Sequence, residues 1–64
     1  MKVNGKNQPI KSNENLLDFL EINAYDITKI AIERNGEIIP KLMYHQVKLK
    51  ENDALEIVSF VGGG

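Results

Sequence analysis

Residues 54–61 read ALEIVSFV, the most strand-like stretch of this 64-residue chain. Leu55 and Ile57 alternate on one face of the expected strand, whereas Val58 and Phe60 share the other face. In a sheet covered on one side only, this pattern leaves Val58 and Phe60 exposed, and an exposed apolar patch indicates a docking surface. The alternative, in which a loop folds over these two side chains, stays open at this point.

Two Asn-Gly pairs predict tight hairpins, because both residue types tolerate positive φ. Asn4-Gly5 joins two short strands in residues 1–11, and Asn35-Gly36 joins two strands in residues 29–40. Pro9 lacks an N–H, so we expect the second short strand at an edge of the sheet. In the second hairpin, one face of the first strand carries Ile30 and Ile32, and the other carries Ala31 and Glu33.

Residues 12–23 read SNENLLDFLEIN and predict a helix. Ser12 or Asn13 is the expected cap, and Asn23 the expected left-handed stop. The expected apolar stripe consists of Leu16, Leu17 and Leu20, flanked by Phe19. We interpret the acidic side chains as the solvated face of this helix, with the docking of a basic partner as the alternative: Glu14, Asp18, Glu21 and Asp26.

The order strand, strand, helix, strand, strand, strand predicts one α+β domain in two layers, with a mixed sheet of four to five strands on one helix. Residues 41–53 are expected to be irregular, with one helical turn near residues 43–46. Asn52 and Asp53 are expected to form a turn before the last strand.

Composition argues against several functions. The net charge is −1 and the lysines are scattered, which argues against nucleic-acid binding. No apolar run approaches the roughly 20 residues that span a bilayer, and we expect a cytoplasmic protein because no signal sequence is seen. There is no cysteine, and His45 is the only histidine, so a metal site is not expected. Ser12 and Ser59 lie in no nucleophile motif, and we expect no enzyme activity.

Residues 62–64 are three glycines. Glycine averages about 7% of residues, so three at a given end arise by chance in roughly 3 chains in 10,000, and a frayed chain end is the alternative to a function. Having no Cβ, such a segment fits a narrow channel and adopts whatever backbone angles a partner requires. The group it presents is the α-carboxylate of Gly64. Because a carboxylate is a poor electrophile, we expect another protein to activate it with ATP, for example as an acyl-adenylate.

The chain resembles the ThiS family of small sulfur carriers, within the ubiquitin-like β-grasp superfamily. The resemblance rests on the pieces VNG, NLLDFLE, IAIERNGEIIP, ND followed by LEIV, and the ending FVGGG, in that order over nearly the whole chain. The chain departs from the family pattern at Lys41, where arginine is frequent, at Tyr44, where tryptophan is frequent, and at Asn52, where glycine is frequent. These departures bear on partner contacts more than on the chemistry of the glycines.

The resemblance implies a β-grasp domain over residues 1–61 and a flexible tail over residues 62–64. It implies that an E1-like adenylyltransferase (ThiF-like) uses ATP to adenylate Gly64. Sulfur from a cysteine desulfurase persulfide then gives a thiocarboxylate, which donates sulfide to thiazole synthase (ThiG-like). In this interpretation Gly62 and Gly63 thread the partner, and no cofactor is bound by the carrier itself.

Val58 and Phe60 are the expected partner-docking patch. Three alternatives stay open: a ubiquitin-like modifier joined to lysine, a molybdopterin-type sulfur carrier, and a plain interaction domain.

Overall fold

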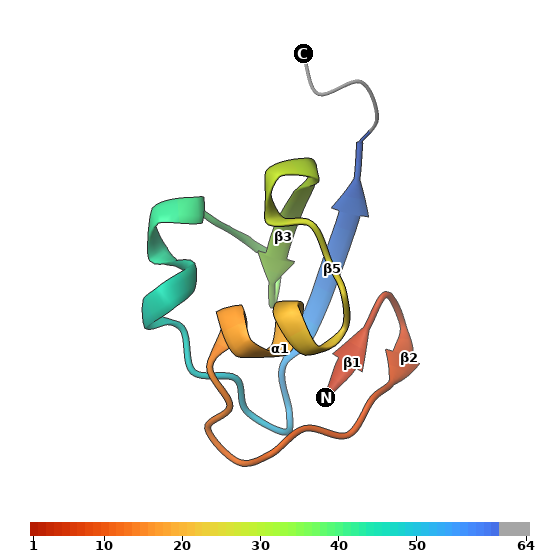
Figure 1. Ribbon diagram of the computed structural model, residues 1–64. Helices are drawn as coiled ribbons and strands as arrows, with labels where there is room; N and C mark the ends of the chain where they lie inside the picture. The colour runs from red at the N-terminus through yellow and green to blue at the C-terminus, as the bar shows by residue number, and fades with distance from the viewer. Residues whose placement is uncertain (61–64) are drawn as a thin grey trace.

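The computed structural model describes residues 1–60, which form one mixed sheet with one α-helix on one of its faces (Figure 1). The five strands are ordered β2-β1-β5-β3-β4 across the sheet. Their bounds are Lys2–Val3 for β1, Lys6–Asn7 for β2, Ile30–Arg34 for β3, Glu37–Ile39 for β4 and Ala54–Ser59 for β5. The helical elements are α1 (Leu16–Ile22) and two 3₁₀ segments, η1 (Ile27–Lys29) and η2 (Lys41–Gln46).

The last strand lies at the centre of the sheet. β5 runs parallel to β1, with Val3 opposite Leu55, and antiparallel to β3, with Ala31 opposite Val58. The two hairpins, β1–β2 and β3–β4, are antiparallel. This arrangement confirms the predicted α+β class and the predicted mixed sheet on one helix.

Both hairpin turns form where the sequence predicts them. Asn4 and Gly5 have φ of 52° and 82°, and Asn35 and Gly36 have φ of 52° and 87°. Positive φ at both central residues is the type I′ pattern, which matches the twist of the flanking strands. Short-range turn chemistry therefore sets both hairpins.

The helix ends differ from the sequence prediction. The N-cap is Asn15, whose Oδ1 accepts hydrogen bonds from the backbone N of Leu17 at 2.9 Å and of Asp18 at 3.4 Å. Neither Ser12 nor Asn13 caps the helix, because Asn13 has φ of 58° and belongs to a turn before it.

At its C-terminus, Asn23 has φ of −92°, so it is not the predicted left-handed stop. The left-handed residue is Ala24, with φ of 61°. The Asn23 side chain instead donates from Nδ2 to the carbonyl of Phe19 at 2.8 Å, which satisfies a carbonyl near the end of the helix.

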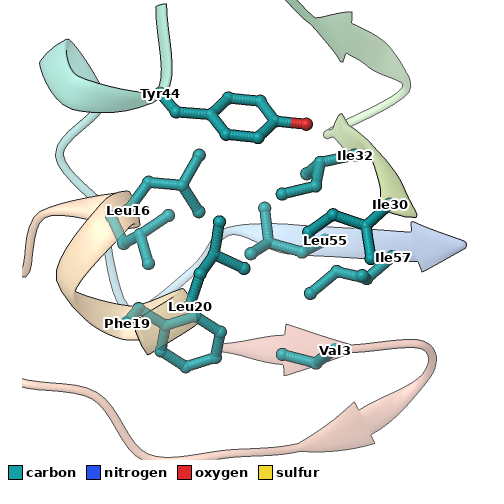
Figure 2. Close-up of a cluster of buried hydrophobic side chains, with 10 residues drawn as sticks. Val3, Leu16, Phe19, Leu20, Ile30, Ile32, Tyr44, Leu55 and Ile57 are labelled. Atoms are coloured by element: carbon teal, nitrogen blue, oxygen red, sulfur yellow. The ribbon is translucent and has the colours of Figure 1, made fainter. Parts of the chain in front are cut away.

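The core lies between α1 and the sheet (Figure 2). From α1 the buried side chains are Leu16, Phe19 and Leu20. Phe19, predicted to flank the apolar stripe, is therefore in the core, whereas Leu17, predicted to be part of the stripe, is only partly buried. The remaining buried apolar residues are Val3, Ile30, Ile32, Tyr44, Leu49, Leu55 and Ile57.

Residues 41–46 are more regular than expected. Where the sequence predicts one helical turn near residues 43–46, the structure has the six-residue 3₁₀ segment η2. Its Tyr44 is 1% exposed. Figure 2 shows the Tyr44 ring lying across the cluster near Leu16 and Ile32. Burial raises the pKa of the Tyr44 phenol above its usual value. The departure from the family pattern at Tyr44 is therefore a core substitution and not a change in a partner contact.

β5 ends two residues before the end of the strand that the sequence predicts over residues 54–61. It stops at Ser59, which is opposite the first residue of β3, Ile30. Phe60 lies outside the strand, although its N–H still donates to the carbonyl of Lys29 at 2.9 Å. The backbone opposite Phe60, at Lys29, belongs to η1 and not to β3, so the pairing of β3 with β5 ends here.

Candidate functional site

The predicted reactive residues lie outside the described part of the chain. Gly62, Gly63 and Gly64, with Val61 before them, follow Phe60, where the description ends. The sulfur-carrying and threading roles of the glycines therefore stay predictions. The surface that leads to them is the end of β5 and its surroundings.

Val58 and Phe60 are both exposed, at 58% and 43%. Val58 points to the face of the sheet opposite α1, because its neighbours Leu55 and Ile57 point into the core. The sequence left open whether these two side chains are exposed or covered by a loop, and the structure shows that they are exposed. The role of Val58 and Phe60 in docking a partner stays a prediction.

An apolar residue that sequence reasoning missed extends this surface. Ile38 on β4 is 72% exposed and lies opposite Glu33, whose side of β3 also carries Ala31. Ala31 in turn lies opposite Val58. We call Ala31, Ile38 and Val58 the open-face patch. The signal was the alternation after the Asn35-Gly36 turn, which sends Ile39 inward and Ile38 outward.

Phe60, the last described residue, lies beside a lysine and a hollow. The Lys41 ammonium lies 5.6 Å from the centroid of the Phe60 ring, within the range of a cation–π interaction. A hollow of about 330 Å³ lies beside the ring. It is lined by Ala24, Tyr25, Asp26, Lys29, Ile30, Ser59 and Phe60. The Lys41 contact and the Phe60–Lys29 hydrogen bond position this residue, and one side of the ring borders the hollow.

The side chain of Asn4 fixes the other edge of β5. Its Oδ1 accepts from the N–H of Ile57 at 2.8 Å, and its Nδ2 donates to the carbonyl of Ile57 at 3.1 Å. The Asn4 backbone N–H donates to the carbonyl of Leu55 at 2.8 Å. One residue thus continues the β1–β5 pairing after the chain has turned away. The sequence indicated only the turn for Asn4.

Two carboxylates with lowered pKa are structural. Asp26 is the cap of η1, not part of the α1 face, and its Oδ1 accepts from the Thr28 hydroxyl at 2.6 Å and the Thr28 N–H at 2.9 Å. These hydrogen bonds lower the pKa of Asp26. They give Asp26 a structural role at the start of η1.

Asp53 is the one buried charged residue among residues 1–60, at 5% exposure. Burial pushes its pKa up, but hydrogen bonds from the Lys50 N–H, the Asn35 amide and the Arg34 guanidinium, with the charge of Arg34, outweigh burial and leave the pKa below 3.8. Through its bonds to Arg34 and Asn35, Asp53 ties the turn before β5 to the β3–β4 hairpin. Asn35 adds a second link, because its Oδ1 accepts from the Ala54 N–H at 2.9 Å. Its lowered pKa is a property of the fold and does not mark a reactive site.

Within the part of the chain that is described, no three His, Cys, Asp or Glu side chains gather to hold a metal ion. His45 is exposed, and its Nε2 is 3.3 Å from the Gln46 side-chain amide. None of the helices in residues 1–60 is both long enough and apolar enough to cross a membrane.

The architecture is that of the β-grasp class. The crystal structure of thiamine biosynthesis protein ThiS from Geobacter metallireducens matches it with a TM-score of 0.82 and 27% identity, covering 98% of this chain and 96% of that one. The ThiS family model matches residues 1–64, and the chain belongs to the ThiS family.

Two curated relatives are each 40% identical to this chain. The sulfur carrier protein ThiS of Bacillus subtilis aligns over 65 residues, which cover 100% of this chain and 98% of the relative. The thiazole synthase of Paramagnetospirillum magneticum aligns over 62 residues, which cover 97% of this chain but 19% of that protein's length. The second relative therefore contains a domain like this one within a much longer chain.

Proposed function

We propose that this protein carries sulfur for the thiazole of thiamin, with Gly64 as the carrying residue. The observation that supports this most strongly is the family match, which runs from residue 1 through the three glycines to residue 64. The Bacillus subtilis relative, which is named a sulfur carrier protein, aligns over the same length. As a member of the ThiS family the protein is a carrier and not a catalyst.

The chemistry begins at the α-carboxylate of Gly64. A carboxylate oxygen attacks the α-phosphorus of ATP, pyrophosphate leaves, and the product is an acyl-adenylate. The outer sulfur of a persulfide, supplied by the desulfurase, then attacks the acyl carbon and AMP leaves, which gives an acyl-disulfide. A thiol attacks the cysteine sulfur of this S–S bond, so that the thiocarboxylate is released and the thiol and the cysteine are left as a disulfide. This chain contains no cysteine, so every persulfide in the sequence of reactions belongs to a partner. ATP is likewise bound by the activating partner, and the carrier holds no cofactor.

Each part of this chain has a defined task in that scheme. Gly62 and Gly63 reach into the partner's active site, because a segment without Cβ atoms passes where other residues do not. Lys41 and Asn4 hold the end of β5, so that the tail starts from a fixed point. Val58 and Phe60 contact the partner around that point.

Three partners follow from this chemistry: a ThiF-like adenylyltransferase, a cysteine desulfurase acting upstream, and a ThiG-like thiazole synthase. The last has support from the Paramagnetospirillum magneticum relative, which is named thiazole synthase and contains a domain like this one. Fusion of two domains keeps them at high effective concentration, as expected for proteins that meet in successive reactions. We place these reactions in the cytoplasm.

Intact mass spectrometry tests the proposal and separates its alternatives. The protein is incubated with an E1-like adenylyltransferase, ATP, a cysteine desulfurase and cysteine. Exchange of one oxygen for sulfur on the C-terminal fragment supports the sulfur carrier, and transfer of that sulfur by thiazole synthase assigns it to thiazole rather than molybdopterin. Isopeptide adducts to lysine would instead make the protein a modifier. An unchanged mass would leave an interaction domain.

A further inference from the structure

The asparagines of the two hairpin turns both hold the central strand by their side chains. Asn35 Oδ1 accepts from the N–H of Ala54 at 2.9 Å, at the start of β5. Asn4 bonds to the N–H and to the carbonyl of Ile57, at 2.8 and 3.1 Å, near the end of β5. Figure 1 shows β5 in the middle of the sheet, with β1 and β3 beside it. The central strand is therefore tied at two points by asparagines that precede glycines.

The Asn-Gly pair also has a chemistry of its own. The backbone nitrogen that follows an asparagine can attack the side-chain Cγ, and glycine leaves this nitrogen unshielded because it has no Cβ. At Gly5 and Gly36, nothing among residues 1–60 lies within 4 Å of the position that a Cβ would take, so both turns have room to change shape. Both turns are exposed to water. Every other asparagine of the chain is followed by a residue with a Cβ.

The reaction is a hydrolysis that needs only water. The glycine nitrogen gives its proton to a solvent base and bonds to Cγ, which closes a five-membered imide. The Cγ–Nδ2 bond breaks, and Nδ2 takes a proton from water and leaves as ammonia. Water then opens the imide at one of its two carbonyls. Cleavage at Cγ gives aspartate, and cleavage at the backbone carbonyl gives isoaspartate, so the net change is NH₂ for OH.

The fold opposes this reaction at both turns. The imide ring contains the Cα–C bond of the asparagine and sets its ψ to a value that a type I′ turn does not have, so the turn must open first. Loss of Nδ2 also removes a donor that is in use, because Asn35 Nδ2 donates to Asp53 at 3.0 Å and Asn4 Nδ2 donates to Ile57. The rate should therefore follow the population of locally open molecules.

The product cannot remake the lost bonds. At position 35 the new carboxylate faces Asp53 Oδ1, so a hydrogen bond becomes a repulsion between like charges. At position 4 a carboxylate oxygen faces the carbonyl of Ile57, and two acceptors stand opposite each other. Isoaspartate also adds an atom to the main chain, which shifts the two strands that the turn joins. A change at either turn thus loosens β5, and a loosened β5 lets the other turn open.

We propose that Asn4 and Asn35 are latent self-modification sites, which their bonds to β5 keep unreactive in the folded chain, and that conversion of either one exposes the other. Conversion is irreversible, since ammonia is lost. A chain that stays folded keeps both amides, whereas a chain that opens often is converted and loses its central strand. This inference concerns the fold and does not depend on whether the chain carries sulfur.

The first test follows the reaction in the wild-type protein, folded in mildly alkaline buffer and unfolded in guanidinium chloride. Trypsin cuts after lysine and arginine, so it releases Asn4 within residues 3–6, Asn35 within residues 35–41 and the control Asn7 within residues 7–11. Mass spectrometry of these peptides measures the exchange of NH₂ for OH. We expect Asn4 and Asn35 to react about tenfold or more slowly in the folded protein than in the unfolded chain. Equal rates in the two solvents would overturn the proposal.

Variants that mimic the product test the loosening of β5. Asn4→Asp and Asn35→Asp make the chemical change at one turn each. Asn7→Asp makes the same change on β2, an exposed edge strand that pairs with β1 and not with β5. Circular dichroism on heating should show a melting temperature about 4 °C or more below that of the wild type for each turn variant, and a nearly unchanged one for Asn7→Asp. Turn variants that melt like the wild type would contradict the loosening.

The coupling of the two turns has its own measurement. In Asn35→Asp, folded in buffer, the rate at Asn4 should rise about threefold or more above its wild-type value, and Asn4→Asp should act likewise on Asn35. Asn7→Asp should change neither rate. In guanidinium chloride all variants should react at the wild-type rate, because no folded structure is left to protect the turns. An unchanged rate at the remaining turn in buffer would overturn the coupling. A turn variant that does not fold shows that its bond is needed, and the wild-type comparison then decides whether the fold protects the amides.

Discussion

Asp53 illustrates how a single carboxylate holds several segments together. Its Oδ2 accepts from Arg34 Nε at 3.0 Å and from the Lys50 N–H at 2.9 Å, and its Oδ1 accepts from Asn35 Nδ2 at 3.0 Å. The Arg34 side chain is 27% exposed and also donates to the carbonyl of Lys48 at 2.9 Å. These bonds join the β3–β4 hairpin to the turn that leads into β5.

Asp53→Asn should reduce the free energy of unfolding by about 1–3 kcal/mol at pH 7, because a donor replaces an acceptor that faces other donors. The folded-state pKa of Asp53 is lowered, so its contribution is present above the unfolded-state value of about 3.8 and is lost as pH falls through the folded-state value. Urea unfolding at pH 7 and at pH 3 checks this. The gap between wild type and variant should narrow in acid, and a gap that widens there contradicts the argument.

Tyr44 is the largest fully buried side chain, so its ring should matter more than its hydroxyl. Tyr44→Ala should cost about 3–5 kcal/mol, as truncation of a buried aromatic ring does, and that approaches the whole stability of a domain this small. Tyr44→Phe keeps the ring and should melt within a few degrees of the wild type. Circular dichroism on heating measures both. A folded, stable Tyr44→Ala protein would show that η2 does not support the core.

At the scale of elements, α1 is only seven residues long, so its cap carries unusual weight. Asn15 caps it and also donates from Nδ2 to the carbonyl of His45 at 2.8 Å, which links α1 to η2. Asn15→Ala should therefore cost about 1–2 kcal/mol, at the upper end for a cap. Ser12→Ala, at the residue that the sequence suggests as cap, is the control and should change the unfolding midpoint very little.

The elements that sequence reasoning found are those with short-range signals. Asn4-Gly5 and Asn35-Gly36 carry the φ preference of their turns in the residues themselves, so both hairpins were predictable. The cap was predicted wrongly: the sequence interpretation chose Ser12 or Asn13, although Asn15, which has the same kind of capping side chain, also precedes the helix within these four positions. The one that caps is decided by the turn at Asn13 and by the bond from Asn15 to His45, thirty residues away.

The residues of the candidate site divide in the same way, into those that a short-range pattern predicts and those that depend on tertiary packing. The outward alternation of Val58 was readable in the strand, and its exposure follows from a sheet with one covered face. The hollow lined by Leu17, Glu21, Tyr25 and Ile27 could not be predicted from the sequence, because it joins α1 to η1 through residues whose burial depends on tertiary packing. The acidic residues were noted, but only the structure separates Asp26, which caps η1, from Glu21, whose side chain makes no hydrogen bond or ion pair within residues 1–60.

At the scale of the whole molecule, stability and chemistry occupy different parts of the chain. The buried apolar residues run from Val3 to Ile57, whereas the proposed sulfur-carrying group is at Gly64. Deletion of Gly64 should therefore leave the melting temperature unchanged within about 1 °C, because the described core is built from residues 3–57, and should abolish gain of sulfur. Calorimetry and intact mass spectrometry report the two effects. A large drop in melting temperature would assign the residue to the fold.

The pairing of β1 with β5 also has a consequence for biosynthesis. Lys2 lies opposite Ala54, and Asn4 bonds to Ile57, 53 positions later in the chain, so β1 must wait for β5 to be synthesised. While the ribosome is still extending the nascent chain, the first hairpin has no central strand to join, and the cooperative structure forms only after β5 has emerged. A stalled or truncated translation product lacking residues 54–59 would be an unfolded chain, open to proteolysis before it met any enzyme.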